Sequence, residues 1–273
     1  MTVLAVSPGD PAGVGPEITA RAIASHRGTG APEGFLVFGD AARLRARFDA
    51  LGVPRVEAGR PGPGEVRLGH CAEWSDETID RHGPSAEGGR AQIAALDAAA
   101  DAVLAADADA LITGPTSKEA VVLGGTPFTG QTEHLADRCG LARDDVTMLF
   151  LGPRLRVGLV TTHLSVQDAA GAVTETRVRR TARHLIEALR RLGASEPRIA
   201  VTGLNPHAGE SGLFGDEELR AITPACAGPF EATVEGPIGA ETAFRLAGEG
   251  AIDGVVAMLH DQATIASKLL DWR

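Results

Sequence analysis

The sequence predicts an α/β fold with parallel sheets, and three observations lead to this expectation. The chain has 273 residues, enough for one large α/β domain or for two domains that share a cleft. Short apolar runs of strand length recur along it, and segments with helical spacing follow most of them. Its 44% apolar and 4% aromatic content indicate a core built from aliphatic side chains.

Composition narrows the possible partners. The formal net charge of -10 argues against a nucleic-acid surface, which needs clustered Lys and Arg. The basic cluster at 177–191 alternates with apolar residues at helical spacing, which is typical of a solvated helix face and leaves an interaction surface as the alternative. No apolar run reaches about 18 residues, so we expect no membrane span. Three widely spaced cysteines favour a cytoplasmic protein with reduced thiols.

In the first half of the chain, apolar runs and helical periodicity alternate. Asp40 is well placed to cap one of the helices. Strands are expected at 3–7, 35–39, 55–57, 66–68 and 109–113, and helices over 16–26, 40–51, 87–106 and from about 131 to Gly140.

The second half continues the alternation. A hairpin is expected from 146–151 and 155–161, joined by Gly152 and Pro153. Further strands are expected at 198–203 and 253–258, a long amphipathic helix over 174–192, and helices that start after Asp216 and Gly236.

Two polar loops follow strands of the first half. The loop 8–17 is rich in Gly but is not the G-x-G-x-x-G fingerprint, because Pro8 and Pro11 interrupt it; a rigid turn and a ligand loop are both compatible with it. Asp10 is its most chemically capable side chain. After the strand at 109–113, Lys118 is either an anion ligand at a helix N-terminus or a surface lysine.

Three histidines stand just beyond strand-like runs: His163, His207 and His260. Parallel strands of one sheet bring their carboxyl ends to one edge, so these imidazoles are candidates to converge. Three imidazoles with an open position form a catalytic divalent-metal site, most commonly for zinc. The alternative is that each is an ordinary hydrogen-bonded loop residue.

Six segments, in this order, resemble motifs of the 4-hydroxythreonine-4-phosphate dehydrogenase family of pyridoxal phosphate biosynthesis. The resemblance runs from residue 3 to about residue 268, and the GLNPHAGE segment is its most specific part. The segments are GDPAGVGPE (9–17), TGPTSK (113–118), FTGQTE (128–133), TTH (161–163), GLNPHAGE (203–210) and HDQ (260–262).

The resemblance implies two α/β/α domains around a cleft, related to the isocitrate and isopropylmalate dehydrogenases. We expect the first domain at 1–125, completed by a C-terminal segment of the family that lies beyond Arg273, and the second at 126–273. The chain is therefore expected to be an incomplete form of the family. The resemblance also implies a homodimer whose subunits share the active site.

The implied activity is NAD- or NADP-dependent, metal-assisted oxidation and decarboxylation of 4-phosphooxy-L-threonine to 3-amino-2-oxopropyl phosphate. The resemblance implies that His163, His207 and the partner subunit's His260 hold the metal, which is zinc or else cobalt, nickel, manganese or magnesium. It assigns substrate contacts to Gln131, Thr132 and Lys268, and catalytic roles to Glu241, Asp261 and Lys268. The cofactor-binding residues are left open.

Two positions depart from the family pattern. Gln131 stands where the family commonly has His, and Glu241 where Asp is usual. Gln can hydrogen-bond a phosphate but carries no charge. Gln131 leaves one alternative, a sister dehydrogenase for another hydroxy acid, such as a four-carbon sugar-acid phosphate or a dihydrodiol carboxylate. The expected lack of the C-terminal segment leaves another, a catalytically incomplete metal-binding form.

Overall fold

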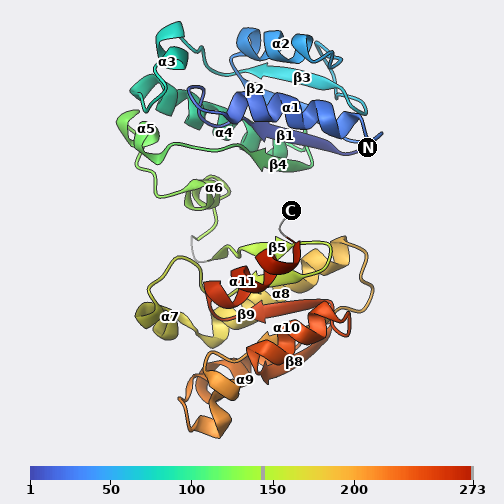
Figure 1. The fold of residues 1–273 in the computed structure, drawn as a ribbon, viewed down its shortest axis with the longest axis vertical. Coiled ribbons are helices and arrows are strands. Elements are labelled where there is room, and N and C mark those ends of the chain that lie inside the picture. The colour runs from blue at the N-terminus through green and yellow to red at the C-terminus, as the bar shows by residue number, and fades with distance from the viewer. Residues whose placement is uncertain (143–144, 272–273) are drawn as a thin grey trace. The chain divides into compact units, whose positions relative to one another are not determined.

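The computed structural model describes residues 1–142 and 145–271; Arg273 lies outside them. The chain divides into two compact units, Met1–Arg143 and Asp144–Arg273. We expected a boundary at 125/126, but contacts assign 126–142 to the first unit, because its helix packs against a helix of that unit (Figure 1). None of the helices in the described part of the chain is long and apolar enough to cross a membrane.

The first unit is a parallel four-stranded sheet with helices on both faces. Its strand order is β3-β2-β1-β4. In chain order its elements are β1 (Val3–Ser7), α1 (Gly15–Arg27), β2 (Gly34–Gly39), α2 (Ala41–Ala50), β3 (Val66–His70), α3 (Asp76–Asp80), α4 (Ala86–Leu104), β4 (Ala110–Thr113), α5 (Lys118–Leu123) and α6 (Gln131–Arg138).

Alternation along the strands decides which helix covers which face of this sheet. Val6 and Val37 pack with α1 and α2, whereas Val3 and Leu36 pack against Ala99 of α4. Successive strand residues point to opposite faces, so each strand serves both layers. The inner strands β1 and β2 are therefore buried on both sides, as their continuous apolar runs predicted, whereas the edge strands β3 and β4 are partly exposed.

Local signals place the ends of several helices. Asp40 caps α2 as predicted, accepting hydrogen bonds from the amides of Ala42 and Arg43 at 3.0 Å. The strand expected at 55–57 is wrong: only an isolated bridge joins Arg55 to Val66. The surrounding Pro and Gly residues limit pairing there.

The second unit contains a five-stranded sheet of order β5-β6-β9-β7-β8. The predicted hairpin is confirmed as the antiparallel pair β5–β6, and the remaining neighbours are parallel. Its elements are β5 (Leu149–Leu151), β6 (Arg156–Leu159), α7 (Val166–Ala172), α8 (Glu175–Arg191), β7 (Arg198–Thr202), η2 (Pro206–Gly212), η3 (Glu218–Ile222), α9 (Thr223–Cys226), β8 (Thr233–Ile238), α10 (Ala240–Gly248), β9 (Gly254–Ala257) and α11 (His260–Asp271).

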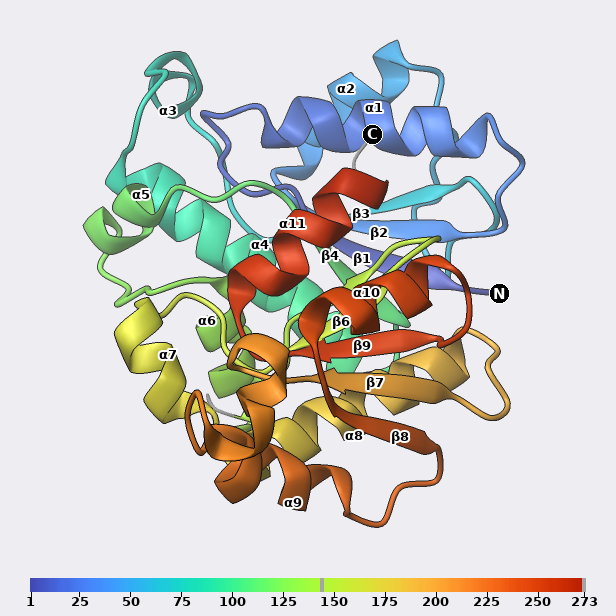
Figure 2. The same ribbon diagram turned by 60° about the horizontal axis from the view of Figure 1, so that its bottom comes forward.

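Helices cover both faces of this sheet as well. Leu185 of α8 and Ile222 of η3 pack with Val256 on one face. Ala243 of α10 and Ala263 of α11 belong to the apolar cluster on the other face, and Figure 2 shows α10 next to β9. The coarse prediction of a mixed α/β fold with parallel sheets is confirmed.

Candidate functional site

The carboxyl ends of β1 and β4 form the topological switch point of the first sheet, because β2 and β3 lie on one side of β1 and β4 on the other. The Gly114 amide donates to the Ser7 carbonyl at 2.6 Å, and the Asp10 amide donates to the Pro115 carbonyl at 3.0 Å. These bonds join the loop after β1 to the loop after β4. Ligands of open parallel sheets bind at such a point.

Gly9 allows the two loops to approach. Its φ is +84°, and a Cβ at this position would lie 2.0 Å from the Pro115 carbonyl oxygen. We expect Gly9→Ala to lower the free energy of unfolding by about 3 kcal/mol or more, measured by urea denaturation, because left-handed strain and a backbone clash add.

Gly30 provides the matched control. It also has a positive φ, +76°, but a Cβ there would meet nothing within 4 Å. Gly30→Ala is therefore expected to cost only about 1 kcal/mol, from backbone strain alone. Equal losses in the two variants would show that the close approach of the loops does not depend on Gly9.

Asp10 is half-buried in the same loop. Burial raises the pKa of its carboxyl group above 3.8, against the opposing effect of a hydrogen bond from the Ala12 amide. The folded state thus binds this proton more tightly than the unfolded state, and ionised Asp10 reduces stability once the pH exceeds the folded pKa.

Asp10→Asn should remove this penalty, because the Asn carbonyl still accepts from Ala12 and never ionises. The variant's gain in unfolding free energy is expected to be absent well below pH 3.8, to grow as the pH rises through the folded pKa, and then to level off. Urea titrations across pH measure it; a gain independent of pH would refute the assigned cause.

Gln131 reaches the switch point from the first residue of α6. Its Nε2 donates to the Gly114 carbonyl at 3.0 Å and to Thr116 Oγ1 at 3.2 Å. Thr132 follows it and is exposed, and Lys118 is exposed at the start of α5. The structure thus places Gln131 at the switch point of the first sheet. The exposed Lys118 is compatible with both expected roles, an anion ligand and a surface lysine.

In the second unit, His163 and His260 follow the adjacent strands β6 and β9. Their ring centroids are 5.6 Å apart, and His260 Nδ1 lies 2.9 Å from Asp261 Oδ1. The segments after the two strands are tied by a hydrogen bond of 2.6 Å from Thr161 Oγ1 to the Met258 carbonyl. Both rings line a hollow of about 360 Å³.

Gln262 ties β9 to the neighbouring strand β7. Its Oε1 accepts from the amides of Met258 and Leu259 at 3.0 Å, and its Nε2 donates to the Gly203 carbonyl at 3.2 Å. One side chain thereby satisfies backbone groups at both strand ends. The His260 segment is held in register with the start of the loop that carries His207.

His207 lies in a strained loop. Five consecutive residues, 207–211, have positive φ angles between 44° and 78°. Buried Glu218 holds the loop: its Oε1 accepts from the amides of Leu204 and Asn205 at 2.8 Å, and its Oε2 accepts from Asn205 Nδ2 at 2.9 Å. Such strain persists only where surrounding bonds enforce it.

The histidine geometry fits a metal in part. Imidazole nitrogens bind zinc at about 2.0–2.1 Å, which at a tetrahedral angle places two ring centroids about 5 Å apart. The His163 and His260 rings of one chain lie 5.6 Å apart, near this separation, whereas the resemblance implied a His260 from the partner subunit. Among the described residues no group of three possible ligands is already assembled, and His207 is exposed on its loop. The three-histidine ligand set stays a prediction.

The other expected site residues of the second unit lie on helices. Glu241 is exposed in the first turn of α10, where it lies 3.5 Å from Arg245. Asp261 is beside His260, and its side chain is 83% exposed. Lys268 is eight residues beyond His260 on α11, about 12 Å along the axis at 1.5 Å per residue. It lines a separate hollow of about 240 Å³ that also includes Phe150 and Asp271.

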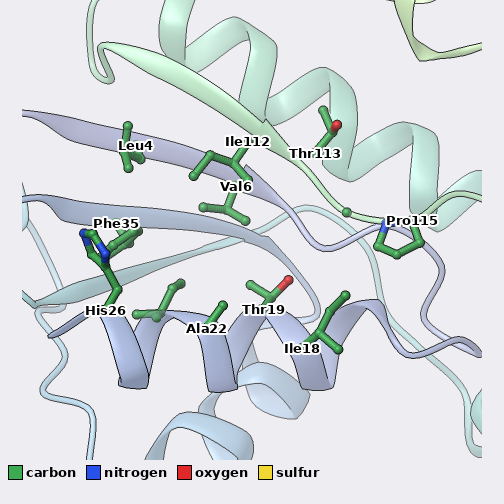
Figure 3. A pocket seen from close by; sticks show the side chains of 12 residues that line it. Leu4, Val6, Ile18, Thr19, Ala22, His26, Phe35, Ile112, Thr113 and Pro115 are labelled. Carbon is green, nitrogen blue, oxygen red and sulfur yellow. The ribbon is translucent and has the colours of Figure 1, made fainter. Parts of the chain in front are cut away.

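A larger hollow, of about 410 Å³, lies between α1 and β4. Figure 3 shows Ile18 and Ala22 of the helix facing Ile112 of the strand across it. Among its described lining residues His26 is the only titratable one, and its ring is paired with Glu33 at 2.9 Å. Apart from His26, which is paired with Glu33, the described residues of this apolar hollow include no acid, base or metal ligand, so we assign it no chemistry.

Sequence reasoning overlooked two residues that hold the candidate site together. Gln262 belongs to the HDQ segment, but nothing in the pattern showed that it spans two strands. Glu218 was only part of an expected helix start. An acidic residue inside an apolar helical face is the signal that would have marked it, because a buried carboxylate needs hydrogen-bond donors.

Comparison with known proteins identifies the family. The sequence pattern described as pyridoxal phosphate biosynthetic protein PdxA matches residues 33–273. The chain belongs to the PdxA family. A 4-hydroxythreonine-4-phosphate dehydrogenase of Burkholderia vietnamiensis is 42% identical over 95% of this chain and 79% of its own length.

Two further PdxA-like proteins extend the comparison. A protein of Salmonella typhi named putative D-threonate 4-phosphate dehydrogenase is 36% identical over 98% of this chain and 84% of its own. The crystal structure of a 4-hydroxythreonine-4-phosphate dehydrogenase from Burkholderia phymatum matches with a TM-score of 0.85 at 33% identity, over 100% of this chain and 84% of that one. The chain is thus similar to enzymes named for two different substrates.

Proposed function

We propose that this protein is an NAD- or NADP-dependent dehydrogenase that converts 4-phosphooxy-L-threonine to 3-amino-2-oxopropyl phosphate, a reaction of pyridoxal phosphate biosynthesis. The observation that carries the proposal is the 42% identity, over 95% of the chain, to an enzyme named for this substrate. Polar side chains at the carboxyl ends of both sheets support it, because such ends bind ligands in α/β proteins.

The reaction has two steps. First, the C–H bond at the hydroxyl-bearing carbon breaks, for which a bound nicotinamide would supply the hydride acceptor, and the hydroxyl proton passes to a base. Then the bond to the carboxylate breaks, carbon dioxide leaves, and the resulting enol takes up a proton. We assign the removal of the hydroxyl proton and the protonation of the enol to Asp261 and Glu241. Lys268 is assigned to bind an anionic group of the substrate.

We also assign a divalent metal to His163, His207 and, in the homodimer, His260 of the partner subunit. When bound, such a metal would supply a Lewis acid that lowers the pKa of the substrate hydroxyl and polarises the product carbonyl. Within one chain the His163 and His260 rings lie 5.6 Å apart, which places both at the sheet edge where we propose the metal. Gln262 and Glu218 act as positioning residues, since they hold the segments on which the histidines stand.

The substrate phosphate is proposed to bind at the start of α6. Gly130 precedes this helix without any side-chain cap, so the amides of the first turn remain available to an anion. The exposed Thr132 hydroxyl is an additional donor. Gln131 fixes the approach of this turn to the β4–α5 loop.

Three broader assignments belong to the same proposal. They are a homodimer with a shared active site, the architectural relation to isocitrate and isopropylmalate dehydrogenases, and a cytoplasmic location. The three free cysteines support the location, because reduced thiols are usual in the cytoplasm.

A specific alternative is D-threonate 4-phosphate, which carries a hydroxyl where 4-phosphooxy-L-threonine carries an ammonium group. The Salmonella typhi relative favours it, at 36% identity. In this alternative the hydride chemistry and the phosphate site are unchanged. The enzyme differs only in preferring a hydroxyl to an ammonium group on the carbon next to the carboxylate.

Steady-state kinetics with both substrates and both nicotinamide cofactors tests the proposal. We expect the higher kcat/KM on 4-phosphooxy-L-threonine, read from the absorbance of the reduced cofactor in protein supplied with zinc, cobalt or manganese. Turnover confined to D-threonate 4-phosphate would establish the alternative. No turnover of either substrate would contradict a dehydrogenase that acts on four-carbon phosphorylated hydroxy acids.

A further inference from the structure

Helix α6 is attached to the first unit through the apolar residues Leu135 and Ala136 and through three polar side chains. It has eight residues, of which only Ala136 is buried. Gln131, His134 and Arg138 stand at positions i, i+3 and i+7, which share one face of a helix. A helix this short is marginal by itself, so its position depends on what these side chains bind.

His134 connects α6 to α4. Its Nε2 lies 2.7 Å from Asp97 Oδ1, and the two side chains are only 19% and 27% exposed. Its ring also contacts Phe128, with centroids 5.9 Å apart, and Phe128 packs into an apolar cluster with Leu96. The imidazole is therefore fixed both by a hydrogen bond and by an aromatic contact.

Arg138, one turn further on, adds a second connection to α4. It lies 3.2 Å from Asp97 Oδ2 and donates from Nε to Asp101 Oδ1 at 2.8 Å. Arg138 thus supplies charge pairing for Asp97 without the imidazole. His134 therefore contributes position rather than charge: its hydrogen bond to Asp97 fixes where the first turn of α6 lies along α4.

This first turn carries Gln131. Both N–H groups of its amide point to the β4–α5 loop, one to the Gly114 carbonyl and one to Thr116 Oγ1. Two such bonds require a narrow range of positions for the helix start, because hydrogen bonds weaken steeply when misaligned. A shift of α6 against α4 would break them.

We infer that His134 is a positioning residue for substrate binding: its hydrogen bond to Asp97 holds the first turn of α6, anchored by Gln131 to the β4–α5 loop, so that the amides of this turn and Thr132 meet the substrate. The inference rests on the proposed function, in which this turn binds the substrate phosphate. His134 itself touches neither substrate nor cofactor.

A double-mutant cycle tests the inference in the full chain. His134→Phe keeps a ring against Phe128 but loses the hydrogen bond to Asp97, whereas His134→Gln retains an N–H donor. We expect His134→Phe to raise KM for the phosphorylated substrate about tenfold with little change in kcat, and His134→Gln to restore most of the loss.

In a Gln131→Ala background, His134→Phe should have no further effect on KM. Asp97→Ala, which removes the same bond from the α4 side, should give the same pattern.

A second readout does not depend on turnover. In ¹⁵N-labelled protein, the side-chain amide signal of Gln131, assigned by its loss in Gln131→Ala, should shift in His134→Phe and in Asp97→Ala and stay in place in His134→Gln. An unchanged Gln131 signal would overturn the inference, as would KM increases of equal size with and without Gln131. If the wild-type protein shows no turnover, the proposed function fails, and the amide signal still decides the role of His134.

Discussion

Replacing either His163 or His260 with alanine is expected to remove the bound metal and to lower kcat/KM by about 10³-fold or more. The two rings lie 5.6 Å apart at the ends of neighbouring strands, at the sheet edge where we propose the metal. A metal contributes several kcal/mol to the stabilisation of developing charge, and each 1.36 kcal/mol is tenfold in rate, which gives about 10³-fold. Elemental analysis of dialysed protein and steady-state kinetics measure the two effects.

His207→Ala tests whether the exposed loop histidine joins this pair. If His207 is the third ligand, its removal reduces metal content as the other two variants do. His82→Asn is the control, because His82 is an exposed histidine of the first unit. Metal content unchanged in His163→Ala and His260→Ala would contradict the proposed site, whatever His207→Ala does.

Glu218→Ala is expected to lower the free energy of unfolding by about 2–4 kcal/mol, because it leaves the amides of Leu204 and Asn205 and the Asn205 side chain without their acceptor. Left-handed backbone costs about 1–2 kcal/mol per non-glycine residue, and the adjacent loop has such φ angles from His207 to Ser211. The loop should therefore relax to ordinary angles and lose its placement of His207. Urea denaturation measures the stability, and metal content reports the placement.

The neighbouring Glu217 provides a matched control. Its carboxylate also accepts from Asn205 Nδ2, at 2.8 Å, but its side chain is 20% exposed. Glu217→Ala should therefore cost less than about 1 kcal/mol and leave the metal in place. If the two variants were equally destabilised, the loop would not depend on the buried carboxylate.

The strand pattern was largely predictable from sequence, because fully buried parallel strands have continuous apolar runs. β1, β2, β7 and β9 have this signature and are largely buried, whereas β4 has an apolar run but lies at a sheet edge with exposed residues. β8 was missed because Gly236 and Pro237 lie within it, and both residues argue against a strand. The helix expected after Asp216 does form, but its first part, Glu218–Ile222, is a π-helix and only Thr223–Cys226 is α-helical. Pro224 lies at this junction, and its nitrogen cannot donate a helical hydrogen bond.

The candidate site was predictable to the level of strand ends. Parallel topology alone indicates that His163 and His260 follow strands at one sheet edge, and the structure brings their rings together. The sequence pattern could not show which distant segments a given side chain contacts. The carboxylate of Glu218 and the amide of Gln262 connect segments distant in sequence, and His134 contacts an aspartate 37 residues earlier. Such pairings depend on tertiary packing.

The most direct test of the proposed function is the product balance of one reaction. Purified protein, supplied with metal and NAD⁺ or NADP⁺, is given 4-phosphooxy-L-threonine labelled with heavy carbon in its carboxylate, and reduced cofactor and labelled carbon dioxide are measured together. We expect the two to appear in equal amounts, with 3-amino-2-oxopropyl phosphate as the organic product. Reduced cofactor without labelled carbon dioxide, or neither product, would contradict the assignment as an oxidative decarboxylase.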